Sequence, residues 1–111
     1  MDVIEQVSGV VTIVEPRGRI DSVTAKEFGE RLVNLLNTGR LRLVIDLKST
    51  SYISSAGFRQ LLIANKTTQE KSGKLALCGI AGEIRRLFDI GAFGELFLIY
   101  QTREDGIASV Q

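Results

Sequence analysis

The chain has 111 residues, a length that suits one domain, and its 44% hydrophobic and 24% charged residues are typical of a folded soluble protein. Its 14 basic and 13 acidic residues give a net charge of +1, which argues against a nucleic-acid-binding protein with a basic face. Because there is no histidine and only one cysteine, Cys78, the sequence offers no Ser–His pair, no internal disulfide and no His or Cys metal site.

Other motifs are missing as well. No apolar run approaches the ~20 residues that span a bilayer, and Met1 to Glu5 lack the features of a signal peptide. The sequence also lacks a Gly-rich phosphate-binding loop. A single cysteine fits a reducing compartment. We therefore expect a cytoplasmic protein without a bound cofactor or metal.

The first third of the chain predicts a β-hairpin followed by a helix. Strands are expected over residues 3–6 and 10–15, around a turn at 8–9 that contains Gly. Asp21 and Ser22 are good N-cap residues for the helix that follows. The apolar positions of this helix share one face: Ala25, Phe28, Leu32, Leu35 and Leu36.

The middle of the chain predicts a buried strand and a second helix. The apolar run within residues 41–47 is typical of a central strand that is covered on both faces. We expect a six-residue polar turn at 48–53, and then Ser54 and Ser55 at the start of an amphipathic helix. The stripe of this helix that faces inward contains Phe58, Leu61, Leu62 and Asn65.

The last third continues the alternation. Residues 75–78 and 96–100 predict strands, and residues 83–90 predict a short helix that ends at Gly91, with Ile84, Leu87 and Phe88 inward. Thr102 to Asp105 resembles a capping box for a C-terminal helix. Strands that alternate with helices pair in parallel, whereas the hairpin adds an antiparallel pair. We predict a single α/β domain over residues 1–111, with a mixed sheet of about five strands and about four helices.

The hydroxyls of Ser54 and Ser55 have two possible roles. Serine is among the best N-cap residues, so capping alone would explain either side chain. A phosphate at a helix N-terminus, however, meets free backbone N–H groups and a favourable dipole. If this surface docks a partner, the roughly −1.5 to −2 charges of a phosphate would prevent docking without a change of fold.

Several short segments, taken in order, carry a resemblance to a known family. After the hairpin come Gly18-Arg19-Ile20-Asp21, Val44-Ile45-Asp46-Leu47, Tyr52-Ile53-Ser54-Ser55-Ala56-Gly57 and Leu87-Phe88-Asp89-Ile90. This order resembles the STAS domain, a family named for sulfate transporters and anti-sigma factor antagonists, over nearly the whole chain.

The resemblance implies a bacterial partner switch that controls transcription. In such a switch, the unphosphorylated domain binds an anti-sigma factor that is also a serine kinase, and this binding frees the sigma factor. The kinase phosphorylates the domain and the complex separates; a metal-dependent serine phosphatase then resets the switch.

The resemblance also implies roles for individual residues. By position, Ser55 matches the phosphorylated serine, and Ser54, which stands where many members have Asp, is the alternative phosphoacceptor. Ala56 occupies what is often a second hydroxyl position, and Gly57 matches a family glycine that allows close backbone approach. All four are expected in the partner-binding surface.

Three charged residues complete the expected partner-binding surface. Asp21 and Asp46 match polar family positions after the second and third strands, so we expect both on the same sheet edge as Ser55. Asp21 would equally serve as an N-cap, and Asp46 as a residue that closes a strand or caps a turn. Arg59, at i+4 from Ser55, would pair with a phosphate, contact a partner or remain a solvated surface residue.

The leading hypothesis is therefore an anti-sigma factor antagonist. The alternative is a STAS subunit of a cytosolic regulatory complex or of a lipid or anion transport complex. A third possibility is an enzyme that uses Asp21, Asp46 and Ser55. The missing histidine and metal-ligand cluster argue against it, so we expect no catalysis.

Overall fold

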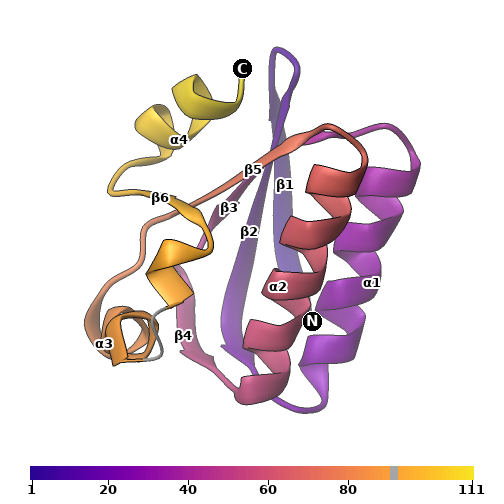
Figure 1. The fold of residues 1–111 in the computed structure, drawn as a ribbon. Helices are drawn as coiled ribbons and strands as arrows, with labels where there is room; N and C mark the ends of the chain where they lie inside the picture. Colours follow the sequence, from indigo (N-terminus) through magenta and orange to yellow (C-terminus); the bar gives the residue numbers. More distant parts are fainter. Residues whose placement is uncertain (91–92) are drawn as a thin grey trace.

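The computed structural model describes residues 1–90 and 93–111, which form a mixed sheet of six strands with helices on both faces (Figure 1). The strands are β1 (Asp2–Ser8), β2 (Val11–Ile20), β3 (Arg42–Asp46), β4 (Thr50–Ile53), β5 (Lys74–Cys78) and β6 (Leu98–Tyr100). The helices are α1 (Thr24–Asn37), α2 (Ser55–Glu70), α3 (Gly82–Ile90) and α4 (Arg103–Val110), with a 3₁₀ turn, η1 (Phe93–Glu95).

The strand pairing confirms the predicted topology. The order is β1-β2-β3-β5-β6, in which β1 and β2 are antiparallel and the remaining neighbours are parallel. Ser8 pairs with Val11, so the hairpin turn consists of Gly9 and Val10, and Gly9 has the positive φ (60°) that such turns require. The predicted hairpin and the parallel crossovers are therefore correct.

The predicted polar turn at 48–53 is wrong in its last four residues, where Thr50–Ile53 forms β4. This strand pairs in parallel with the end of β2, which continues past its predicted end to Ile20. Ile20 lies opposite Ile53 and both are buried, while the Thr50 hydroxyl donates a 2.9 Å hydrogen bond to the Pro16 carbonyl. A four-residue strand with only one aliphatic residue carries too weak a pattern to be recognised in the sequence.

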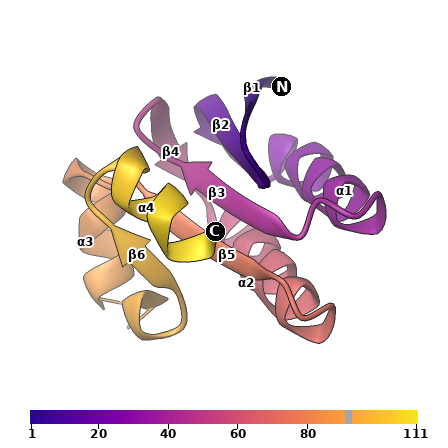
Figure 2. The same cartoon turned by 90° about the horizontal axis from the view of Figure 1, so that it is seen from above.

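Alternating side chains of the sheet contribute to two cores. Val14, Ile45 and Leu77 belong to the larger core, which also takes in the apolar faces of α1, α2 and α3. Figure 1 shows α1 and α2 side by side against the sheet, and Figure 2 shows α4 apart from that pair. Val44 and Ala76 belong to the smaller core, which includes Val110 of α4.

The short helix α3 differs from its predicted packing in one position. Ile84 and Phe88 are buried as expected, and the Phe88 ring packs edge-on against Phe58 at 5.0 Å between centroids. Leu87, which we predicted to point inward, is 38% exposed because α3 packs through the i, i+4 pair of Ile84 and Phe88. The predicted helix end at Gly91 lies outside the described residues.

Candidate functional site

The start of α2 is attached to the end of β2 by a backbone contact. The Ser54 N–H donates a 2.8 Å hydrogen bond to the Ile20 carbonyl oxygen, directly after the paired residues Ile20 and Ile53. This bond brings together the β2–α1 turn and the first residues of α2, at the lower end of the molecule in Figure 1. Three of the predicted site residues, Asp21, Ser54 and Ser55, therefore lie close together.

Ser54 and Ser55 differ in what their hydroxyls do. Ser54 is the N-cap of α2: its backbone is extended, its side chain is half-buried, and its Oγ accepts a 3.2 Å hydrogen bond from the Gly57 N–H. Ser55 is the first helical residue, and its exposed hydroxyl has no hydrogen bond to any residue that the structure describes. Capping therefore explains Ser54, whereas Ser55 has a hydroxyl that is free to react.

Gly57 permits the close approach that this junction requires. A Cβ built at this position would lie 2.8 Å from Ile53 Cγ2, 2.9 Å from Ile20 Cγ2 and 3.2 Å from the Ile20 carbonyl oxygen. Ala56, its half-buried neighbour, packs against the larger core. A glycine at 57 thus holds the first turn of α2 against the ends of β2 and β4.

Asp21 caps α1. Its Oδ1 accepts hydrogen bonds from the N–H groups of Val23 and Thr24, both at 3.0 Å, and from the Thr24 hydroxyl at 3.1 Å. These bonds hold the pKa of Asp21 below its usual value, and the bond from the Thr24 N–H has the largest effect. The carboxylate is therefore charged at neutral pH. A contact between Asp21 and a partner stays a prediction.

Asp46 does not lie beside Ser55, and our expectation of a shared edge is wrong for this residue. Ile45 pairs with Val14, so Asp46 is level with Glu15, whereas β2 continues to Ile20 before it reaches the site. The Asp46 side chain is 2% exposed, and it accepts hydrogen bonds from the Lys48 N–H at 3.0 Å and from Arg103 Nε at 2.9 Å.

Asp46 is instead part of a charged cluster that the sequence did not reveal. Arg103, the first residue of α4, also donates to Glu15 Oε1 at 2.6 Å, and the Ser49 hydroxyl donates to Glu15 Oε2 at 2.6 Å. The bond from Ser49, followed by that from Arg103, keeps the pKa of Glu15 low despite burial. Burial alone would lower the pKa of Arg103. The hydrogen bonds to Asp46 and Glu15 and the electrostatic attraction of these carboxylates outweigh that effect, so the pKa is raised overall. The cluster fixes α4 to β2 and β3.

The remaining predicted residue, Arg59, is exposed on α2 and forms no ion pair with any described residue. Cys78 is buried, which raises the pKa of its thiol to about 12 and makes it a poor nucleophile. Within residues 1–90 and 93–111, no group of three His, Cys, Asp or Glu side chains is arranged to hold a metal ion. No helix in the same ranges is long and apolar enough to cross a membrane.

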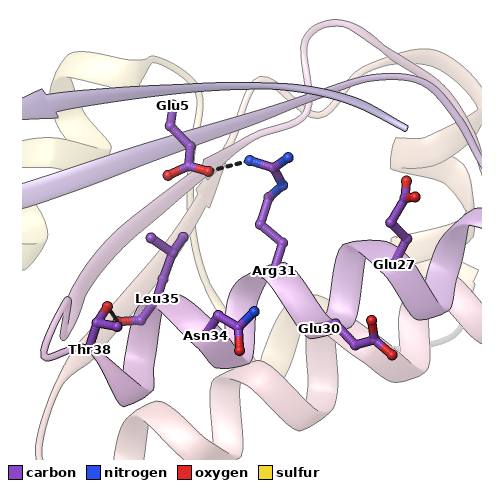
Figure 3. Close-up of a pocket in the computed structure, with 7 residues that line it drawn as sticks. All are labelled: Glu5, Glu27, Glu30, Arg31, Asn34, Leu35 and Thr38. Atoms are coloured by element: carbon purple, nitrogen blue, oxygen red, sulfur yellow. Dashed lines mark hydrogen bonds and ion pairs between the residues drawn. The ribbon is translucent and has the colours of Figure 1, made fainter.

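A surface cavity of about 450 Å³ lies between β1 and α1 (Figure 3). An ion pair between Glu5 and Arg31 crosses it. The remaining lining residues are Glu27, Glu30, Asn34, Leu35 and Thr38. None of the residues predicted to bind a partner lines this cavity.

Comparison with known proteins connects this geometry to a family. Residues 3–106 match the family profile of the STAS domain. The chain is 32% identical to BtrV of Bordetella bronchiseptica, a candidate anti-sigma factor antagonist, over 84% of this chain and 80% of BtrV. It is also 32% identical to an anti-sigma-B factor antagonist of Bacillus subtilis, over 81% of this chain and 82% of that protein.

A solved structure from Thermotoga maritima has the same fold. That protein, a candidate anti-sigma factor antagonist, superposes with a TM-score of 0.92 at 18% sequence identity, over 97% of this chain and 93% of that one. The family profile covers nearly the whole sequence, and the topology agrees with a solved structure of the same kind. The chain belongs to the STAS domain family.

Proposed function

We propose that this chain is an anti-sigma factor antagonist whose unphosphorylated form binds an anti-sigma factor that is also a serine kinase. Phosphorylation of Ser55 by that kinase releases the complex, and a serine phosphatase restores the unphosphorylated form. One observation carries the proposal: Ser55 presents an exposed, unbonded hydroxyl at the first residue of α2, beside the β2–α1 turn.

The local backbone is suited to carry a phosphate. The first N–H groups of a helix have no intrahelical partner, and here the Ser54 Oγ takes that of Gly57, which leaves those of Ser55 and Ala56. A phosphate on Ser55 would meet these two N–H groups and the positive end of the helix dipole. Phosphorylation therefore leaves α2 intact and changes only the charge and shape of the surface.

The docking surface proposed here consists of Asp21, Ser54, Ser55, Ala56, Gly57 and Arg59. Since Asp21 is charged at neutral pH, a phosphate nearby would add to its negative charge and shift the charge of this surface toward negative. An acidic or poorly hydrated partner surface would then be repelled. Asp46 is buried and accepts a hydrogen bond from Arg103, so we do not place it in the docking surface.

We further propose that the chain has no catalytic activity of its own and acts in the cytoplasm. Asp21 and Asp46, the two carboxylates of the possible enzyme site, each accept hydrogen bonds from neighbouring residues and lie at different positions along the strands. Among the described residues, neither carboxylate accepts a hydrogen bond from the Ser55 hydroxyl, as a general base that activates this hydroxyl would.

The direct test is incubation with an anti-sigma factor kinase of the same organism and ATP, followed by mapping of the phosphorylated residue. The parent and Ser54→Ala are expected to carry one phosphate at Ser55, and Ser55→Ala none. Phosphate found only on Ser54, or on neither serine, contradicts the assignment. Association with a membrane permease in place of a kinase would favour a STAS subunit of a transport complex.

A further inference from the structure

Two large apolar side chains are exposed on either side of the bond between Ser54 and Ile20. Val23, in the β2–α1 turn, is 81% exposed, and Tyr52, in β4, is 38% exposed. Single exposed apolar residues are common on protein surfaces. Tyr52, however, lies three residues before Ser55, and Val23 lies three residues after Ile20, on segments that the Ser54–Ile20 bond holds together.

The backbone of Val23 and the side chain of Tyr52 are held in place before any partner arrives. The Val23 N–H is bound by the Asp21 carboxylate at 3.0 Å, which fixes the turn. Tyr52 pairs across the sheet with Arg19, whose guanidinium lies 4.2 Å from the centre of the tyrosine ring. Side chains that are ordered in advance lose little conformational entropy on binding, so they are efficient anchors.

The same end of β2 carries two cations, one of which, Arg19, stacks on Tyr52 and attracts the Asp21 carboxylate. Arg17 and Arg19 are both exposed, and neither forms an ion pair within the described part of the chain. Arg31, Arg85, Arg86 and Arg103 each pair with a carboxylate. Arg17, Arg19 and the exposed Arg59 outnumber the carboxylates of Asp2 and Asp21 at this end, so the charge complementary to this surface is negative.

We propose that Val23 and Tyr52 are the apolar anchors of the partner complex, and that the partner's surface is an apolar pocket bordered by carboxylates that face Arg17 and Arg19. This inference rests on the proposed function, with an anti-sigma factor kinase as the occupant, and specifies the chemistry of that occupant's surface. It also gives a reason for release, since a phosphate on Ser55 would bring negative charge against an acidic border.

A second copy of this chain is a poor occupant. In a two-fold symmetric contact the same patch meets itself, so the cations of one protomer would lie near those of the other. Like charges placed opposite one another oppose association.

The experiment is titration calorimetry of the kinase with purified variants, each checked by a melting curve. Tyr52→Ala is expected to weaken binding about 30-fold and Val23→Ser about tenfold, the sizes typical of a buried aromatic anchor and a smaller apolar one. Tyr52→Phe should bind within about threefold of the parent, because it keeps the ring. Val23→Ser tests the anchor without risk to the fold, since its side chain is mostly exposed.

Matched controls come from the opposite end of the molecule. Val10, 67% exposed at the hairpin tip, provides Val10→Ser, and the exposed Arg40 provides Arg40→Gln (Figure 1). Both should bind as the parent does. Parent affinity should fall as salt is raised, and the double variant Arg17→Gln/Arg19→Gln should bind more weakly with a smaller dependence on salt.

The outcomes separate this inference from the proposed function. If the parent binds the kinase and is phosphorylated but Val23→Ser and Tyr52→Ala bind equally well, the inference is wrong and the proposed function stands. If the parent binds no anti-sigma factor kinase, both fail. Self-association, or binding to phosphatidylglycerol vesicles, that Val23→Ser abolishes would assign the patch to another occupant and overturn the inference.

Discussion

The N–H of Ser54 donates a 2.8 Å hydrogen bond to the carbonyl oxygen of Ile20, so the residue that caps α2 is fixed to the residue that ends β2. The bond continues the pairing of β4 with β2 and places the exposed Ser55 next to the turn that Asp21 organises. A charge added at Ser55 therefore acts on a surface whose backbone is already held in place.

The two adjacent serines are expected to differ in their contribution to stability. Ser54→Ala removes the N-cap hydrogen bond to Gly57 and should lower the free energy of unfolding by about 1 kcal/mol. Ser55→Ala removes a hydroxyl without a hydrogen bond and should change it by less than about 0.5 kcal/mol. Urea denaturation of both variants measures the difference. Equal losses would show that Ser54 is not the effective cap.

Gly57→Ala should destabilise the domain by about 1–3 kcal/mol, because its Cβ would lie 2.8 and 2.9 Å from the methyl groups of Ile53 and Ile20. Gly94→Ala is the control, since its nearest neighbour would lie 3.7 Å away, an ordinary contact. Thermal melts of the two variants provide the comparison. A Gly57→Ala protein as stable as the parent would contradict the close approach of α2 to β2 and β4.

Arg103→Met should destabilise the domain by about 2–4 kcal/mol, because it removes the guanidinium that donates a hydrogen bond to the buried Asp46 carboxylate and leaves only the Lys48 ammonium, 4.0 Å away. Arg40→Met, a change at an exposed residue without an ion pair among the described residues, should have little effect. Urea denaturation measures both. Hydrogen exchange should also show faster opening of α4 in Arg103→Met, and unchanged exchange there would argue against the cluster as the attachment of α4.

The acid sensitivity of the domain should depend in part on Glu15. Since the pKa of Glu15 is lowered in the folded state, folding favours its charged form. The resulting stability is present above the unfolded pKa, near the ordinary 4.5, and is lost as the pH falls through the lower folded value. Glu15→Gln should therefore lose less stability than the parent between about pH 6 and about pH 3. Denaturation at several pH values measures the free energy of unfolding of both proteins. If it falls equally in Glu15→Gln and in the parent, this prediction is wrong.

Much of the fold could be predicted because its strands and helices have strong periodic patterns. The nearly continuous apolar run that ends at Leu47, broken only by Asp46, and the spaced apolar residues of α1 identified a central strand and an amphipathic helix. β4 escaped prediction because its stability comes from pairing Ile53 with Ile20, a contact distant in sequence. The Arg103 cluster escaped for the same reason, since Glu15 and Asp46 meet Arg103 only in the folded sheet.

The site was predicted in part. Local sequence identified a helix start at Ser54 and Ser55 and a capping role for Asp21, because caps act over a few residues. Which serine caps and which is exposed depends on where the helix begins, and this is set by the bond from Ser54 to Ile20. The position of Asp46 along the strands depends on how far β2 extends past its pairing with β3. No short stretch of sequence predicts this extension.

The central claim is that charge at Ser55 blocks docking locally and leaves the fold unchanged. The most direct measurement is calorimetry of Ser55→Asp with the anti-sigma factor kinase, alongside a melting curve of the variant. An acidic side chain at the first residue of a helix is favourable, so the melting temperature should stay within a few degrees of the parent's while affinity falls at least about tenfold. Undiminished affinity, or a loss of affinity accompanied by unfolding, would contradict the account.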